Sequence, residues 1–226
     1  MIASTRTAMR KVWIPSGCHR LGGTLHIPPN PVGVVAFAHG SGSGRFSPRN
    51  QFVARILQEA GLATLLLDLL EEEEADDRRK VFDIELLAGR LQGAAEWLGA
   101  DTETSALNIG YFGASTGAGA ALVAAARSPQ PVKAVVSRGG RPDLADAFLP
   151  AVKAPTLLLV GGRDDTVLEL NEKALRRLRC PKNLVVIRNA THLFPEPGTL
   201  EEVALLARDW FLRFLAPAQH LASQAE

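Results

Sequence analysis

The segment GYFGASTGAG, residues 110–119, lies between an apolar run and a segment rich in small residues. Glycines that flank a serine suit two different chemistries. They allow backbone N–H groups at a helix N-terminus to hold a phosphate, or they give a nucleophilic serine room on a tight strand-to-helix turn. The surrounding sequence has to decide between the two.

Apolar runs and helical patterns alternate around this segment. Two short extended pieces, residues 11–15 and 21–27, read as an antiparallel edge. The predicted buried strands are 32–38, 62–67, 107–112, 132–137, 155–160 and 183–187, and the predicted helices are 49–60, 82–98, 115–127, 143–148, 167–178 and 200–215. Strands that alternate with helices predict a mainly parallel sheet of α/β class. We expect one domain over residues 1–226, with a frayed tail at 217–226.

Composition excludes several classes of protein. A net charge of +1 gives no reason to expect a nucleic-acid partner. No apolar run approaches the roughly 20 residues that span a bilayer, and the first residues lack a secretory-type apolar segment. The two cysteines, Cys18 and Cys180, form neither a disulfide framework nor a metal-ligand spacing. We therefore expect a cytoplasmic protein without metal or other cofactor.

A dinucleotide-binding loop is the first interpretation of the glycines. The spacing of Gly113, Gly117 and Gly119 matches the pattern of short-chain dehydrogenases, but their loop follows the first strand, and here several strands come earlier. Those enzymes also need a Tyr-x3-Lys pair, whereas the single tyrosine, Tyr111, lies inside the predicted strand. The NAD(P) interpretation is therefore disfavoured, and Gly119 is expected only to let the helix pack against the sheet.

A nucleophile elbow fits better, because residues 113–117 read G-x-S-x-G. A serine becomes a nucleophile when a base takes its proton and an acid orients that base. Two carboxylates, Asp164 and Asp165, follow the predicted strand 155–160, and His192 follows the strand 183–187. The ends of parallel strands meet at one sheet edge, where sites of open α/β sheets are built.

These residues carry a resemblance. From HGSGSG through GASTG and GGRDDTV to NATHLF, the chain resembles an α/β-hydrolase, close to the dienelactone hydrolase-like group. That fold has a mostly parallel central sheet with helices on both faces, and little or no lid is expected here. The family pattern G-x-D-x-x-V makes Asp164 the acid and leaves Asp165 as the alternative. Dienelactone hydrolases proper use cysteine where this chain has Ser115, so their substrate does not carry over.

The resemblance also assigns the loop after the first buried strand. His39 and Gly40 match the oxyanion-loop pattern, in which the histidine supports the loop, so His192 is preferred over His39 as the base. The expected oxyanion donors are the backbone N–H groups of Thr116 and Ser41, with Gly42 the alternative to Ser41. His39, Gly40 and Gly42 also count as candidate substrate contacts.

Two charged features are less specific. Arg138, at the end of strand 132–137, would bind a substrate carboxylate or form a structural ion pair. The acidic run at 71–77 is expected to be a solvated loop or helix start, although it could border the pocket.

The sequence thus predicts a hydrolase of small carboxylic esters, lactones or thioesters, in which Ser115, His192 and Asp164 form a catalytic triad. A non-catalytic ligand-binding or regulatory protein on the same scaffold is the alternative. The oligomeric state is not predicted.

Overall fold

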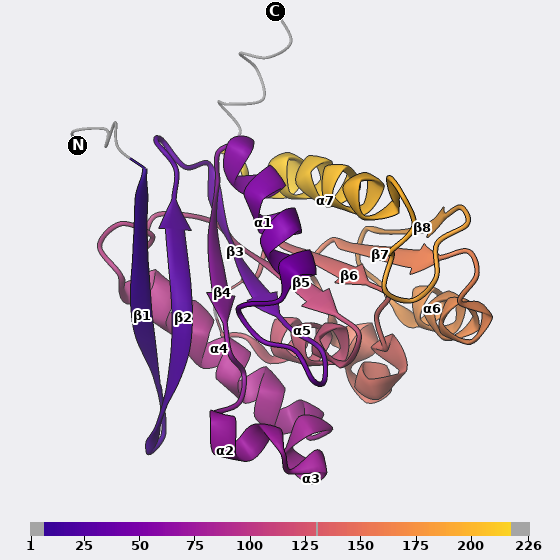
Figure 1. Cartoon of the computed structure of the whole chain (residues 1–226), viewed down its shortest axis with the longest axis horizontal. Helices are drawn as coiled ribbons and strands as arrows, with labels where there is room; N and C mark the ends of the chain where they lie inside the picture. Colours follow the sequence, from indigo (N-terminus) through magenta and orange to yellow (C-terminus); the bar gives the residue numbers. More distant parts are fainter. Residues whose placement is uncertain (1–6, 130, 218–226) are drawn as a thin grey trace, which may run out of the picture.

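The computed structural model describes residues 7–129 and 131–217 of the chain. Eight strands form one sheet in the order β1-β2-β4-β3-β5-β6-β7-β8 (Figure 1). They are β1 Ala8–Ser16, β2 His19–Ile27, β3 Gly33–Ala38, β4 Leu62–Leu67, β5 Ile109–Ala114, β6 Ala134–Arg138, β7 Thr156–Gly161 and β8 Lys182–Ile187. The predicted antiparallel edge is confirmed, because β1 pairs with β2 and β2 with β4 antiparallel. The pairs from β4 through β8 are parallel.

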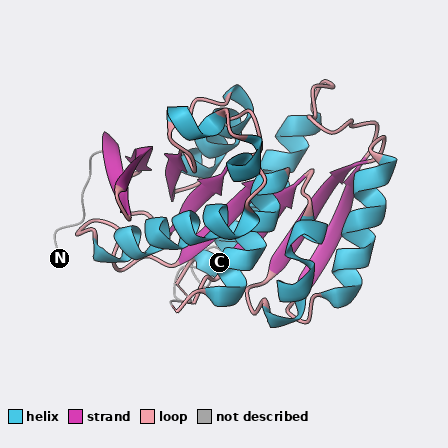
Figure 2. Cartoon of the chain, turned by 90° about the horizontal axis from the view of Figure 1, so that it is seen from below, coloured by secondary structure: helices cyan, strands magenta, loops and turns pink. Residues whose placement is uncertain are grey.

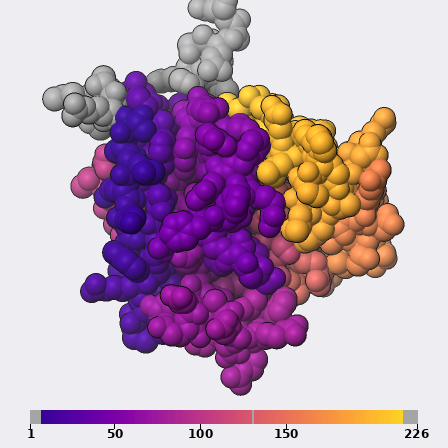
Figure 3. Space-filling model, in the orientation of Figure 1, coloured from indigo at the N-terminus to yellow at the C-terminus, as the bar shows by residue number. Residues whose placement is uncertain are grey.

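Helices cover both faces of this sheet, as Figure 2 shows. The helical elements are α1 Pro48–Glu59, α2 Glu72–Ala75, α3 Arg78–Val81, α4 Ile84–Ala100, α5 Thr116–Arg127, the 3-10 helix η1 Pro142–Ala151, α6 Asp165–Arg177 and α7 Thr199–Leu215. The α1 and α7 helices pack on one face, which Figure 3 presents. The α4, α5, η1 and α6 helices pack on the other face.

Local sequence explains where these elements begin. All residues of β3, β4, β5 and β7 are buried, as expected for apolar strands covered on both faces. Ser47 caps α1 by accepting a hydrogen bond from the Asn50 N–H, and Pro48 occupies the first helical position. Asp83 caps α4 in the same way. The mostly parallel sheet with helices on both faces confirms the α/β-hydrolase architecture inferred from the sequence.

Some predicted boundaries were wrong. The strand predicted at 107–112 is β5, Ile109–Ala114, so Ser115 follows its last residue directly. Of the two alternatives for the acidic run at 71–77, the helix start is observed, because the run contains the one-turn helix α2 and ends at Asp77, the cap of α3. Between β6 and β7 only η1 occurs, which leaves no room for a large lid there. Gly119 packs against Arg141, which precedes η1, and Leu144 of η1, not against the sheet.

In the described part of the chain, no helix has the length and apolar character needed to cross a membrane. The expected frayed tail, apart from its first residue, lies outside the described residues.

Candidate active site

Ser115 connects β5 to α5 on a tight, strained turn. Its backbone has φ 51° and ψ −122°, a conformation that non-glycine residues rarely adopt and that is concentrated at functional sites. The two glycines of the motif permit this turn. A Cβ on Gly113 would lie 2.4 Å from the Ala118 Cα, and one on Gly117 would lie 2.2 Å from the Ala38 carbonyl oxygen. Both glycines are therefore required by close backbone packing rather than by an open phosphate cradle.

His192 lies against a single carboxylate, that of Asp164. The Nδ1 atom of His192 is 2.6 Å from Oδ2 of Asp164. Asp164 is the residue just before α6, and its side chain is 15% exposed, whereas Asp165 is exposed at the start of the helix. With Nδ1 protonated and donating to the carboxylate, Nε2 is left as the basic nitrogen.

The end of β6 joins the elbow to the histidine loop. The Ser115 N–H donates to the Arg138 carbonyl (3.2 Å), and the Ser115 carbonyl accepts from the Arg141 N–H (3.0 Å). A Cβ on Gly139, between them, would lie 3.0 Å from the His192 carbonyl oxygen. Within the described residues, no hydrogen bond joins the Ser115 hydroxyl to His192. Catalytic hydrogen bonds commonly tighten only when substrate is bound.

His39 holds the loop that follows β3. Its ring is buried, with Nδ1 3.0 Å from the Gly40 carbonyl oxygen and Nε2 accepting from the Leu69 N–H at 2.9 Å. Burial lowers the pKa of His39 below its ordinary value, so the neutral ring that these two bonds require is favoured. Because both ring nitrogens are engaged, His39 has none left for a substrate atom or for the Ser115 proton.

The two expected oxyanion donors, the N–H groups of Thr116 and Ser41, both lie next to the Thr116 side chain. Thr116 is the first residue of α5, so its N–H is one of the free N–H groups at the helix start. The Ser41 N–H donates to Oγ1 of Thr116 at 3.1 Å. Gly42 has a positive φ of 66°, and a Cβ there would meet no atom within 4 Å. The sequence placed these residues together but did not indicate that a side chain accepts the Ser41 N–H bond.

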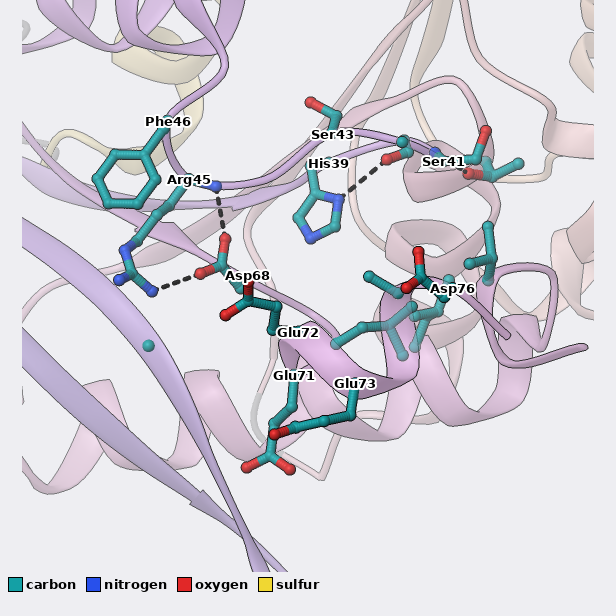
Figure 4. Close-up of a pocket in the computed structure, with 18 of the residues that line it drawn as sticks. His39, Ser41, Ser43, Arg45, Phe46, Asp68, Glu71, Glu72, Glu73 and Asp76 are labelled. Atoms are coloured by element: carbon teal, nitrogen blue, oxygen red, sulfur yellow. Dashed lines mark hydrogen bonds and ion pairs between the residues drawn. The ribbon is translucent and has the colours of Figure 1, made fainter. Parts of the chain in front are cut away.

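A cavity of about 840 Å³ opens beside this loop. Its wall includes Thr116, Ser41, Gly40, Gly42 and the ring of His39. Figure 4 shows the opposite side, where the carboxylates of Glu71, Glu72, Glu73 and Asp76 gather. Asp68 also faces the cavity and pairs with Arg45. The acidic run, which contains helix α2, therefore borders the cavity.

Three side chains at and near the acidic run lie close enough together to be considered as a metal-binding group. His19, Glu71 and Glu74 have ligand atoms within 4.8 Å of one another in the described residues. However, Nδ1 of His19 already lies 2.5 Å from Glu71, and the Glu74 carboxylate is held by Arg90 and Lys80. These contacts hold the group together without an ion.

The dienelactone hydrolase family model matches residues 21–216. The chain belongs to the dienelactone hydrolase family. It is 57% identical to the crystal structure of a dienelactone hydrolase from Anabaena variabilis, with a TM-score of 0.90 over 92% of this chain and 99% of that chain. Est1E from Butyrivibrio proteoclasticus is 17% identical, with a TM-score of 0.76 over 90% of this chain and 98% of that one, and shares the fold.

A curated relative bears a different kind of name. The protein "Putative phosphoribosyl transferase" of Mycobacterium tuberculosis is 57% identical over 205 residues, which are 91% of this chain and 46% of that protein. The chain thus spans less than half the length of this relative. Membership in the dienelactone hydrolase family, together with the structural neighbours, supports a hydrolase.

Arg138 is the last residue of β6, and its side chain is buried without a partner. Its Nε and Nη1 atoms are buried and make no hydrogen bond, and no carboxylate of the described residues pairs with it. Burial and the nearby Arg49 lower the pKa of Arg138 to about 10, so it remains charged at neutral pH. The structural ion pair considered from the sequence is absent from the described chain.

Proposed function

We propose that this family member is a serine hydrolase of small carboxylic esters, lactones or thioesters. The observation that carries the proposal is the strained Ser115 turn at the sheet edge where His192 contacts Asp164. A hydroxyl on such a turn, with a paired imidazole in the adjoining loop, is the arrangement that acyl transfer requires.

In the proposed reaction, the Ser115 hydroxyl attacks the carbonyl carbon while Nε2 of His192 takes its proton. Asp164 orients the imidazole and stabilises the imidazolium through Nδ1. The tetrahedral intermediate collapses as His192 returns the proton to the leaving oxygen or sulfur, which leaves an acyl-Ser115. Water then repeats the cycle, activated by His192, and releases the carboxylic acid.

The developing negative charge on the carbonyl oxygen needs preorganised donors. The Thr116 N–H is the first proposed donor, because it follows the nucleophile at a helix N-terminus. The loop at Ser41 is the second, although its N–H is engaged with Thr116 Oγ1 before substrate binds. Gly40 permits this approach, since a Cβ there would lie 3.0 Å from the Ala114 carbonyl oxygen and the Ser115 Cβ.

Arg138 is the proposed contact for an anionic substrate group. An uncompensated buried charge is costly, and a carboxylate would satisfy it. Gly42 and the His39 ring edge remain proposed contacts in the cavity wall. The proposed reaction uses no cofactor. We also propose that the protein is cytoplasmic.

A ligand-binding protein on a hydrolase scaffold is the competing function. It requires neither the strained turn nor the pairing of His192 with Asp164. A phosphoribosyl transferase activity is not proposed for this chain, because the relative so named has more than half its length outside the match.

One experiment separates hydrolysis from binding. Wild type and Ser115→Ala are compared for 4-nitrophenyl acetate turnover and for labelling by a fluorophosphonate. We expect turnover and labelling in wild type and loss of both in the variant. Equal behaviour of the two proteins would overturn the proposal. A screen of short-chain esters, lactones and thioesters would then identify the preferred bond.

A further inference from the structure

The hydroxyl of Thr116 is a buried polar group in the wall of the cavity. Thr116 is only 3% exposed, and it lines the cavity directly after the nucleophile. Its Oγ1 accepts the Ser41 N–H at 3.1 Å. The hydrogen of this hydroxyl, by contrast, is donated to no acceptor among the described residues. A hydroxyl can accept and donate at once, so one donor is unused beside Ser115.

The surrounding backbone fixes this pair of residues. Gly117 packs against the carbonyl oxygens of Ala38 and His39, where a Cβ would lie at 2.2 and 2.4 Å, so α5 and the end of β3 are in contact. His39 ties the following loop to Leu69 through Nε2. These contacts hold the start of the loop against α5, where the Ser41 N–H is directed at Thr116.

We propose that the Thr116 hydroxyl is itself an oxyanion donor, a role that rests on the proposed hydrolase function. The Ser41 N–H then acts through it, by donating to Oγ1 while Oγ1 donates to the substrate carbonyl oxygen. Donation into a hydroxyl polarises it and strengthens the bond that it makes in turn. No proton is transferred. The Thr116 backbone N–H remains the other donor to the oxyanion, and the Ser41 N–H reaches the oxyanion through Oγ1 instead of donating to it directly.

Threonine suits this role better than other small residues. Its β-branched side chain restricts χ1 in a helix, and its hydroxyl can occupy one of two rotamers. A buried hydroxyl with an unsatisfied hydrogen gains a partner when the carbonyl oxygen becomes charged. The interaction strengthens as charge develops, so it should act on kcat more than on KM.

The test compares Thr116→Val, which removes the hydroxyl at nearly constant shape, with Thr116→Ser, which restores it. Loss of one oxyanion donor lowers kcat by about 10²–10³-fold, and a side-chain donor beside an intact backbone donor should account for roughly 10–100-fold of kcat. We expect that loss in Thr116→Val with a KM change below about threefold, and recovery of at least a third of the wild-type kcat in Thr116→Ser. The rate of Ser115 labelling by a fluorophosphonate, whose phosphoryl oxygen takes the oxyanion position, should fall in parallel.

Thr156→Val is the control, because Thr156 is also a buried threonine with a hydrogen-bonded hydroxyl, but it begins β7, at the sheet edge opposite the strand ends that carry the site. It should leave kcat unchanged. If Thr116→Val does not fold, as judged by its thermal unfolding, Thr116→Ala provides the same comparison.

A Thr116→Val variant with wild-type or higher kcat overturns the inference, since the hydroxyl would then only occupy the Ser41 N–H. That result leaves the proposed hydrolase intact as long as wild-type turnover depends on Ser115. Absence of Ser115-dependent turnover in wild type overturns both.

Discussion

At the scale of single residues, the pairing of His192 with Asp164 decides which of two adjacent carboxylates supports the proposed base. Asp164 contacts Nδ1 at 2.6 Å, and Asp165 begins α6 exposed to solvent. The sequence favoured Asp164 only through a family pattern, because two neighbouring aspartates cannot be told apart by composition or periodicity.

Asp164→Asn should lower kcat by about 10³–10⁴-fold, since the amide favours the wrong imidazole tautomer. Asp165→Asn is the matched control and should change kcat by less than about threefold. Steady-state hydrolysis of 4-nitrophenyl acetate measures both. A larger loss in Asp165→Asn would show that the acid has been misassigned.

Arg138 gives a second prediction at this scale. An uncompensated buried charge is costly, and replacing even a paired buried charge by apolar residues is often neutral or stabilising. Arg138→Met should therefore not lower the free energy of unfolding measured in urea. The ratio of kcat/KM for an anionic ester, 4-nitrophenyl hemisuccinate, to that for 4-nitrophenyl acetate should fall about tenfold. An unchanged ratio would remove Arg138 from the substrate site.

At the scale of elements, the contact between α5 and β3 holds the Ser115 turn against the loop that follows β3. It depends on Gly117, which the sequence motif predicted, and on the carbonyl groups at the end of β3, which no sequence pattern specifies. Helix α2 is the converse case. The acidic run suggested a solvated segment, but Glu74 is buried and forms an ion pair with Arg90 of α4. Because the two residues are 16 positions apart in the chain, local periodicity of the sequence does not indicate this pair.

Gly117→Ala should unfold the protein or abolish activity, because its Cβ would lie within 2.4 Å of two carbonyl oxygens. Gly89→Ala in α4 is the control, since a Cβ there meets no atom within 4 Å. It should stabilise the fold by up to about 1 kcal/mol through helix propensity. Thermal unfolding compares the two, and equal melting temperatures would contradict the close packing of α5 on β3.

The Glu74–Arg90 pair gives a prediction in pH. Two hydrogen bonds of 2.6 and 2.9 Å from Arg90 hold the pKa of the Glu74 carboxyl well below its ordinary value of 4.5. The stabilisation is therefore complete above about pH 4.5 and is lost as the pH falls further. Breaking a buried pair from one side costs about 3–5 kcal/mol, so Glu74→Gln should lower the free energy of unfolding at pH 7 by that order. Urea unfolding at pH 7 and pH 3.5 should show a smaller difference between wild type and variant at the lower pH. An equal difference at both values would contradict the linkage.

At the scale of the whole molecule, the order of motifs predicted the fold because each motif follows the end of a strand, and parallel strands end at the same edge of the sheet. The parallel sheet and the absence of a large insertion between β6 and β7 agree with the order of strands and helices read from the sequence, and the antiparallel edge at β1 and β2 agrees with the two short extended pieces at 11–15 and 21–27. The unpaired state of Arg138 and the engagement of Ser41 with Thr116 did not follow, because both depend on which side chains meet across elements far apart in the chain. In the relative named as a putative phosphoribosyl transferase, the region that matches this chain makes up 46% of the protein.

The most direct test of the central claim is to locate the covalent intermediate. Wild-type protein is reacted with a fluorophosphonate, digested, and analysed by tandem mass spectrometry of the peptide that contains residues 110–119. The account predicts one phosphonyl adduct, on Ser115, and none in Ser115→Ala. An adduct on another residue, or an unmodified Ser115 in protein that still hydrolyses esters, would contradict it.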